Sequence, residues 1–552
     1  MSTPSTGRKK HARARGSLLS STQCHGDSSV AVRNWCVRIW PGVGAAVAVI
    51  LLAGSVDAAT KVVYDSTNFF TVGADGYGIV GITSLDKTAI FGDSLHLAAT
   101  GKLTSFTWAA FNGSGSPADL TSASQTISFY RQSDASLIGS FNATITDLAR
   151  GASKTYTADL GSANIVLDTP DVLVTQQIPF WPPGTPTYRL GIPIATASNT
   201  PAIGSTTAGY YLSQFGSQGA FITNASYPNY SSAVYQAVVL PDVTWNTTSG
   251  TWNTSTANWT TGSGPSEEFS DGSQATFNNA TGGVVTLSGA LAPRAVVVSA
   301  TGGNYAFVST AGNQITGAAT LSKSGAGTLL LYGPNTYSGA TTVSAGKLLV
   351  NGSLANSAVT VGNGGTLGGT GPFGSLVTVQ SGGVLSPGNS PGALAAAVLD
   401  LQAGSTTFME IVGSGSAAGV AGNDYDQVQI TTSGGLTYGG TLDLEFGNGP
   451  SFANGTSFDL FAFAGSPVGH FSSVVSSGSG VYAGRTFSGS GGIWTSLAGG
   501  HQLTFSELTG QLTIALAAVP EIDPATGSSA VTLVAGALAI LDQRRRRAKV
   551  VA

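Results

Sequence analysis

Three short segments with one pattern decide the fold of the middle of this chain: Val343-Ser344-Ala345-Gly346, Val361-Gly362-Asn363-Gly364 and Val379-Gln380-Ser381-Gly382. The three valines are spaced by 18 residues, each following a threonine and preceding a leucine: Thr342, Thr360, Thr378 and Leu348, Leu367, Leu385. A unit of strand, glycine turn and short strand cannot bury its apolar side alone, so it must stack on its neighbours. The repeat predicts a right-handed β-solenoid, or β-helix, over residues 286–400, in which each coil adds about 4.8 Å.

Segments around this repeat resemble the autotransporter-associated β-strand repeat family. The similar segments are Lys323–Leu329, Asn335–Val343, Gly346–Leu348, Leu385–Gly392 and Tyr425–Val428. The resemblance covers roughly residues 245–480. It implies a β-solenoid that is exposed at a cell surface.

The segments on either side of the solenoid also indicate β structure. Residues 60–241 contain short runs that alternate apolar and polar side chains, such as Phe141–Ile145, which predicts a two-sheet β-sandwich. Residues 242–285 form a strand-turn segment rich in Trp, Thr and Asn, and residues 401–518 alternate again. We expect the latter to form a β-rich C-terminal cap that covers the last open edge of the solenoid.

The last part of the chain has three elements in order. Val519-Pro520-Glu521-Ile522-Asp523-Pro524 precedes an almost uncharged run, 525–541, which is followed by Arg544-Arg545-Arg546-Arg547. The run of 17 residues is near the lower limit of ~17–25 for a span of the bilayer, so it predicts a C-terminal transmembrane helix. The arginines would be its cytoplasmic stop-transfer signal, and the preceding residues would lie across the membrane.

This tail, residues 519–548, resembles the sorting signals of the PEP-CTERM class, in the variant that reads Val-Pro-Glu-Ile-Asp. The resemblance implies processing by an exosortase-type membrane enzyme that recognises residues 519–524. The alternative is an ordinary tail anchor that is never cleaved.

The N-terminal residues 1–58 read as a signal peptide with a long basic n-region. An apolar run, residues 43–54, precedes Val56-Asp57-Ala58, the small-x-small pattern at which signal peptidase cuts. We expect cleavage after Ala58 or Ala59. Both cysteines, Cys24 and Cys36, lie in this leader, so the mature protein would contain no disulfide and no thiolate site.

Composition excludes one class of partner. Charged residues make up 9% of the chain, against about 25% in ordinary soluble proteins. Residues 60–518 contain 11 basic and 22 acidic residues, a net charge near −11. A sparse acidic surface does not attract phosphate backbones, so the composition disfavours nucleic-acid binding.

The solenoid segment lacks the residues that acid–base catalysis needs. Residues 272–399 contain no Asp, Glu or His, and their only charges are Arg294, Lys323 and Lys347. Polysaccharide hydrolases and lyases built on a β-helix need clustered carboxylates or a calcium site. Asp424-Tyr425-Asp426 with Asn423 is the best cation candidate, but a turn that leads into a strand is favoured there. We therefore predict no catalytic residue, no cofactor and no metal site.

Three functions from different classes stay open at this point. The favoured one is an exported, non-enzymatic structural or adhesive protein of the cell surface or extracellular matrix, anchored in the membrane at least transiently. A carbohydrate-binding surface protein would use Trp181, Trp252 or Trp259 as stacking platforms for an extracellular polysaccharide, although a packing role is favoured for these tryptophans. A polysaccharide-degrading enzyme would need the acids of the first domain, Asp119, Asp134 and Asp147, to converge in a cleft.

Overall fold

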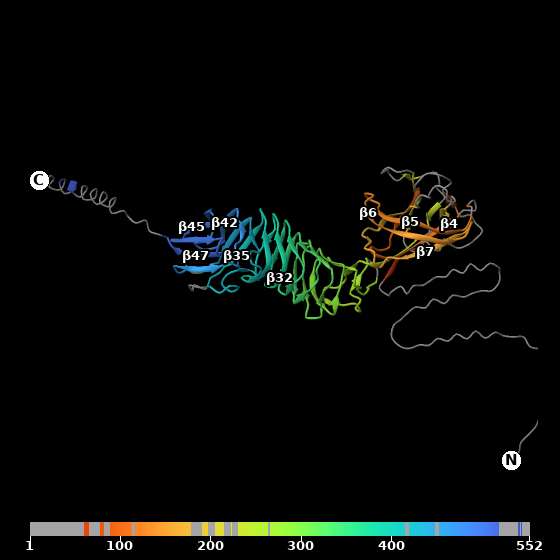
Figure 1. Cartoon of the computed structure of the whole chain (residues 1–552). Helices are drawn as coiled ribbons and strands as arrows, with labels where there is room; N and C mark the ends of the chain where they lie inside the picture. Colours follow the sequence, from red (N-terminus) through yellow and green to blue (C-terminus); the bar gives the residue numbers. More distant parts are fainter. Residues whose placement is uncertain are drawn as a thin grey trace, which may run out of the picture. The chain divides into compact units, whose positions relative to one another are not determined.

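The computed structural model describes residues 60–65, 78–81, 89–112, 116, 118–177, 190–196, 205–214, 222–223, 230–233, 235–262, 265–413, 419–447, 452–517, 539–540 and 543. These residues fall within one compact unit, Val56–Ala552. Nearly all of the described secondary structure is β-strand (Figure 1).

The first domain consists of two antiparallel sheets, as the alternating sequence predicts. One sheet contains β1 (Lys61–Asp65), β2 (Gly78–Gly81), β4 (Gly101–Asn112), β7 (Ser153–Asp159), β8 (Val166–Leu167), β10 (Leu190–Thr196), β13 (Tyr230–Ala233) and β14 (Tyr235–Pro241). The other contains β3 (Ala89–His96), β5 (Leu120–Arg131), β6 (Leu137–Leu148), β9 (Asp171–Gln177), β11 (Ser205–Gln214) and β12 (Ile222–Thr223).

A shared apolar core joins these two sheets. Phe106 of β4 and Phe129 of β5 are both buried, and their rings meet edge to face with centroids 5.1 Å apart. Tyr235 of β14 packs on Phe106 from the same sheet, with centroids 5.4 Å apart. The first domain is therefore a β-sandwich.

The chain changes from antiparallel to parallel pairing after β14. Two long sheets, here called sheet C and sheet D, run through the rest of the described chain. Sheet C contains β15 (Val243–Trp245), β17 (Trp259–Thr260), β18 (Gln274–Phe277), β21 (Ala295–Val298), β24 (Thr320–Lys323), β26 (Pro334–Asn335), β27 (Thr341–Val343), β29 (Ser353–Leu354), β30 (Val359–Val361), β32 (Pro372–Val379), β34 (Ala393–Leu401), β36 (Gln427–Ile430), β37 (Leu436–Tyr438), β40 (Phe461–Ala462) and β41 (Val468–Gly469).

Sheet D alternates with sheet C along the chain. It contains β16 (Gly250–Trp252), β19 (Gly282–Leu287), β22 (Asn304–Val308), β25 (Thr328–Tyr332), β28 (Gly346–Val350), β31 (Gly365–Gly368), β33 (Val384–Leu385), β35 (Thr406–Ile411), β38 (Thr441–Phe446), β42 (Ser473–Gly478) and β43 (Arg485–Thr486). A separate parallel pair is formed by β20 (Ala290–Leu291) and β23 (Gln314–Ile315). Parallel rungs thus extend from Val243 to Gly478, beyond the 286–400 expected from the repeat.

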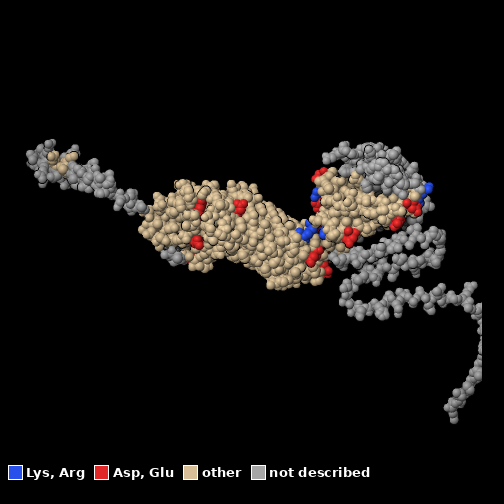
Figure 2. Space-filling model, in the orientation of Figure 1, with Lys and Arg blue, Asp and Glu red and all other residues tan. Residues whose placement is uncertain are grey.

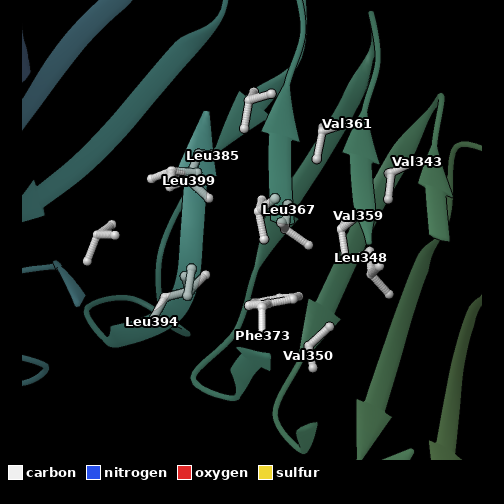
Figure 3. Close-up of a cluster of buried hydrophobic side chains, with 14 of the residues drawn as sticks. Val343, Leu348, Val350, Val359, Val361, Leu367, Phe373, Leu385, Leu394 and Leu399 are labelled. Atoms are coloured by element: carbon white, nitrogen blue, oxygen red, sulfur yellow. The ribbon is translucent and has the colours of Figure 1, made fainter. Parts of the chain in front are cut away.

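The 18-residue units are layered one above another. Thr342 pairs with Thr360, and Thr360 pairs with Thr378, in parallel register. Their flanking valines and leucines point inward and are fully buried, so that like side chains stack between rungs (Figure 3). The stacking predicted from the repeat is confirmed.

A glycine turn allows each rung to change direction. Gly346 has φ 66°, and a Cβ at this position would lie 2.4 Å from the carbonyl oxygen of Gly325 in the rung below. Only glycine combines a left-handed backbone with so close an approach. The other two repeat glycines, Gly364 and Gly382, share the positive φ, 85° and 77°, whereas the close approach to the backbone of the rung below is particular to Gly346.

A five-stranded antiparallel sheet follows the last rungs. Its strands, in spatial order, are β39 (Thr456–Asp459), β47 (Gln511–Leu516), β46 (His501–Ser506), β45 (Ile493–Ala498) and β44 (Ser488–Ser490). Phe505 of β46 packs on Phe461 of β40, with ring centroids 6.2 Å apart, and both belong to the solenoid core. This cap sheet continues the core past the last parallel rung.

The predicted C-terminal transmembrane helix is the part of the expected fold that is wrong. No helix among the described residues is long and apolar enough to cross a bilayer. The 525–541 run is short for a span and includes Gly527, Ser528 and Gly536, which weaken both helix formation and hydropathy. Apart from Ala539 and Ile540, this run lies outside the described residues.

Candidate functional site

Two of the three tryptophans considered as sugar platforms, Trp252 and Trp259, are core residues, as expected of packing anchors. Trp252 and Trp259 have no exposed surface, and Trp245 is 2% exposed. Their rings pack on one another, with centroids 5.0 Å apart for Trp245 and Trp259 and 5.3 Å for Trp252 and Trp259, and all three contact Phe277. A sugar can stack only on an exposed ring face, so Trp252 and Trp259 do not provide one. Trp181 lies outside the described residues.

The three acids of the first domain do not converge. Asp119 and Asp147 lie at one end of the β5–β6 hairpin, where Leu120 pairs with Leu148. Asp134 lies in the turn at the other end, next to the Tyr130–Leu137 pair. Strands of this length, 12 residues each, separate the two ends by about 35 Å. These carboxylates therefore cannot act on one glycosidic bond.

Asp426 has a structural role in the solenoid. Its carboxylate is buried and accepts hydrogen bonds from the backbone N–H of Gly392 at 2.7 Å and of Glu410 at 2.9 Å. Burial raises the pKa of Asp426 to about 7, although these two N–H donors oppose the shift. The nearby Asp424 accepts from the N–H of Val420 at 2.7 Å. The two acids thus tie loops to strands.

No metal centre is formed in the described part of the chain. Groups of three or more His, Cys, Asp or Glu side chains that could hold an ion are absent from the described residues. Glu410 and Glu445 are neighbours in the β35–β38 ladder, and burial, followed by the charges of Glu410 and Asp443, raises the pKa of Glu445. These acids place negative charge on neighbouring strands, but they do not form a group of ligands around a common point.

The histidines pair with separate partners. His96 lies 2.7 Å from Asp171 in the sandwich, and His501 lies 3.3 Å from the hydroxyl of Tyr482. His470 lies 2.6 Å from Glu507. Each of these three described histidines thus contacts a different acidic or hydroxyl side chain.

Glu507 connects the cap sheet to the last turn of the solenoid. Its side chain is buried and accepts the backbone N–H of Phe471 and the indole N–H of Trp494, both at 2.9 Å. His470 binds the second carboxylate oxygen. A carboxylate with three donors holds β45, the β46–β47 turn and the segment after β41 together.

Lys323 is a buried cation inside the stack. It is 1% exposed, and its ammonium group donates to the carbonyl of Gly325 and, at 3.1 Å, to the carbonyl of Ala345. Burial lowers the pKa of Lys323. It therefore bridges two consecutive glycine turns, a role that its sequence context did not signal.

The described residues also form a polar hollow that sequence reasoning missed. A cavity of about 700 Å³ lies beside the first rungs. Its walls carry hydroxyl, amide and charged groups from Thr100, Val166, Asp168, Asp242, Thr244, Thr261, Gly262, Gln274, Thr276 and Arg294. These positions span nearly 200 residues of sequence, so no local motif could reveal the hollow.

An ion pair organises one wall of this hollow. Arg294 donates to Asp242 at 2.6 Å, and both side chains are largely buried. Asp242 also accepts from the Thr100 hydroxyl and from the backbone N–H of Gln274, each at 3.3 Å. The Nε of Arg294 is buried and has no hydrogen-bond partner among the described residues. Asp168, the third charged side chain of the lining, is paired with Arg131. Because all three charges are paired, the other lining side chains offer mainly neutral hydrogen-bonding groups.

The predicted processing sites lie outside the described residues. This applies to Ala58 and Ala59 at the signal-peptide cut, to residues 519–524 of the sorting motif, and to Arg544–Arg547 of the stop-transfer signal. They stay predictions of the sequence.

Comparison with protein families identifies two segments. Residues 519–549 match the VPEID-CTERM protein sorting domain, and residues 321–350 match the passenger-associated-transport-repeat. A search of curated proteins finds no match to the chain. The resemblance stated from sequence is thereby confirmed: a sorting signal of the PEP-CTERM type follows a passenger-type repeat. The protein is exported and sorted to the cell surface, and its tail implies a membrane enzyme that processes it.

Proposed function

We propose that this protein is a non-enzymatic structural or adhesive component of the cell surface or extracellular matrix. The parallel solenoid is its scaffold, and the tail directs the scaffold to its place. A signal peptidase would cut at Ala58 or Ala59, and an exosortase-type membrane enzyme would act on residues 519–524.

The observation that carries this proposal is the continuous stack of rungs with an almost uncharged surface. In-register parallel pairing continues from Val243 to Gly478. On the face shown in Figure 2, the middle of the solenoid carries no charged side chain, whereas acidic residues appear nearer its end. A regular surface of this kind suits repeated contacts with a matrix better than the selective binding of a small substrate.

The arrangement of acids supports a role without catalysis. Three carboxylates are buried among the described residues, those of Asp93, Asp426 and Glu507. Those of Asp426 and Glu507 are occupied by backbone and indole donors. A general acid or base needs access to a substrate proton. None of the three carboxylates lines the polar hollow.

Localisation and surface attachment test the proposal together. The full chain is expressed in its host with an epitope inserted at residues 414–418, and surface exposure is measured by labelling of intact cells. We expect labelled surface protein, and we expect a Pro520→Ala/Glu521→Ala variant to accumulate as a larger unprocessed form. Loss of the gene should weaken cell attachment or the matrix.

Two results would contradict the proposal. One is surface exposure without any change in attachment or matrix when the gene is deleted. The other is turnover of a polysaccharide by the purified full chain that disappears when a single carboxylate is replaced.

A further inference from the structure

Sheet C carries a row of hydroxyl groups along its outer face. Parallel register places one outward side chain of each rung beside the next. The row, here called the hydroxyl ladder, consists of Thr244, Thr276, Val297, Ser322, Thr342, Thr360 and Thr378. All but Val297 bear a hydroxyl, and the row is about 30 Å long at the ordinary strand spacing.

The ladder is open to solvent and has free hydrogen-bonding capacity. None of its side chains is buried. The hydroxyls of Ser322, Thr342, Thr360 and Thr378 make no hydrogen bond to the rest of the described chain. The residues two positions before Thr342, Thr360 and Thr378 lie on the same face and are exposed. They are Ala340, Ala358 and Leu376. From Thr244 to Thr378 the row therefore presents hydroxyl and apolar groups without charge, and the next position in register is Asp400.

The hydroxyl ladder begins in the polar hollow. Its first two members, Thr244 and Thr276, line the cavity of about 700 Å³. Gln274, which lies on the same face of β18 as Thr276 and donates to its hydroxyl at 3.3 Å, lines it too. The volume lies within the range of ~300–1,000 Å³ for small-molecule sites. A ligand seated in the hollow could thus continue directly along the ladder.

We infer that the ladder and the hollow form one binding site for a neutral, linear polysaccharide. The chain lies along the rungs, and one end occupies the hollow. A polymer with a regular spacing of hydroxyl groups can both donate to and accept from a regular row of protein hydroxyls. Each bond is weak, but many in series give useful affinity.

The absence of clustered cations on the ladder and in the hollow favours a neutral polysaccharide over an anionic one. The ladder positions carry no cation, and the hollow is lined by two acids, Asp168 and Asp242, against one cation, Arg294, which is paired with Asp242. Anionic polymers are normally held by clustered Lys and Arg. The face therefore fits a polymer that is itself uncharged.

A second copy of this chain fits the face less well. Two such strips packed together would bury rows of hydroxyls against alanine and leucine, and buried hydroxyls without partners are costly. A second copy bound to this strip would also leave the polar groups of the hollow without a binding partner. A polysaccharide satisfies both parts of the site.

This inference deepens the proposed function by naming the matrix component that the scaffold contacts. It is tested by native gel electrophoresis of the full chain through gels that contain hydroxyethyl cellulose, laminarin or pullulan, with alginate as the anionic comparison. We expect at least one neutral polymer to retard the protein and alginate to have no effect.

The decisive variant is Thr342→Val/Thr360→Val/Thr378→Val, which removes three hydroxyls and keeps shape and strand preference. We expect affinity for the retarding polymer to fall about tenfold or more. The matched control is Thr328→Val/Thr366→Val/Thr406→Val on the outer side of sheet D, which should bind like the wild type. A Gln274→Leu variant should weaken binding through the hollow. Circular dichroism checks that each variant is folded.

Three outcomes would overturn the inference: no retardation by any neutral polymer, retardation by alginate alone, or equal retardation of the ladder variant and the wild type. Sedimentation of the free proteins tests a fourth outcome. If the wild type is a dimer, the ladder variant is a monomer and no neutral polymer binds, the occupant of the face is a second copy of this chain. Surface labelling of cells is unaffected by these results, so failure here leaves the proposed surface function standing.

Discussion

The sandwich and the solenoid are both built from β-strands, but they obtain their stability in different ways. In the sandwich, strands pair over long sequence separations, as Lys61 does with Val239. In the solenoid, each rung pairs with the next, as Thr342 does with Thr360. The free energy of unfolding of a stack is approximately the sum of the stabilities of its rungs and of the interfaces between neighbouring rungs. A sandwich, in contrast, unfolds as one cooperative unit. The comparison predicts that the two regions respond separately to mutation.

The largest expected effect is a loss of stability in one core, that of the sandwich or that of the solenoid, without a loss in the other. Phe129→Ala empties the centre of the sandwich and should destabilise that domain by about 3–5 kcal/mol. In calorimetry of the full chain, the sandwich transition should move to lower temperature and the solenoid transition should stay in place. Leu367→Ala, a fully buried rung residue, is the matched control and should move only the solenoid transition. A single transition that moves with both variants would contradict the comparison.

Between about pH 4 and pH 7, a pH dependence of stability is expected in the solenoid, where Asp426 is buried. Because the folded pKa of Asp426 is raised to about 7 from an ordinary 3.8, the native state holds more protons than the unfolded state between these values. The stabilisation is fully present below about pH 4 and is lost as the pH rises to about 7, by at most about 4 kcal/mol. Thermal unfolding at several pH values measures it.

Asp426→Asn provides the check on this assignment. It should remove that part of the pH dependence from the solenoid transition and leave the sandwich transition unchanged. If the variant and the wild type show the same slope of stability against pH, the assignment to Asp426 is wrong.

Removing the Glu507 carboxylate, which connects the cap sheet to the solenoid, should destabilise the cap end of the stack more than its middle. Glu507→Ala leaves the N–H groups of Phe471 and Trp494 without their acceptor, a loss of about 2–3 kcal/mol. Hydrogen exchange should rise in β45–β47 and in the last rungs, and should stay low near β27 and β30. Glu268→Ala, an exposed acid at the other end of the solenoid, serves as the control. Uniform exchange along the whole solenoid would argue against nearest-neighbour stability.

The smallest expected effect concerns the outer faces of the solenoid. Thr366→Val on sheet D and Thr360→Val on sheet C should each change stability by less than about 0.5 kcal/mol, because both side chains are at the surface. Chemical denaturation measures this. A larger loss for Thr360→Val would mean that the hydroxyl ladder supports the fold and is not reserved for a ligand.

The sequence predicted the repetitive part of the molecule well because its signal is local. The 18-residue spacing of Val343, Val361 and Val379 reports stacking directly, since only a layered arrangement buries all three valines in the same way. The tail motif was equally readable, because a sorting enzyme recognises a short linear segment. The tryptophans at 252 and 259 show the limit of a local signal. A role as packing anchors is favoured from the sequence and their burial confirms it, but the pattern of residue types does not by itself distinguish an anchor from an exposed sugar platform.

The sequence by itself determined the stacked rungs, the sandwich that precedes them and the sorting signal of the tail, because each depends on patterns within a few tens of residues. Only the tertiary structure decided which tryptophans are buried, how far the parallel pairing extends, and that Thr100, Asp242 and Arg294 meet at a hollow where the hydroxyl ladder begins. Those features depend on register and on contacts between distant segments, which a pattern of side chains cannot specify until the strands have been placed beside one another.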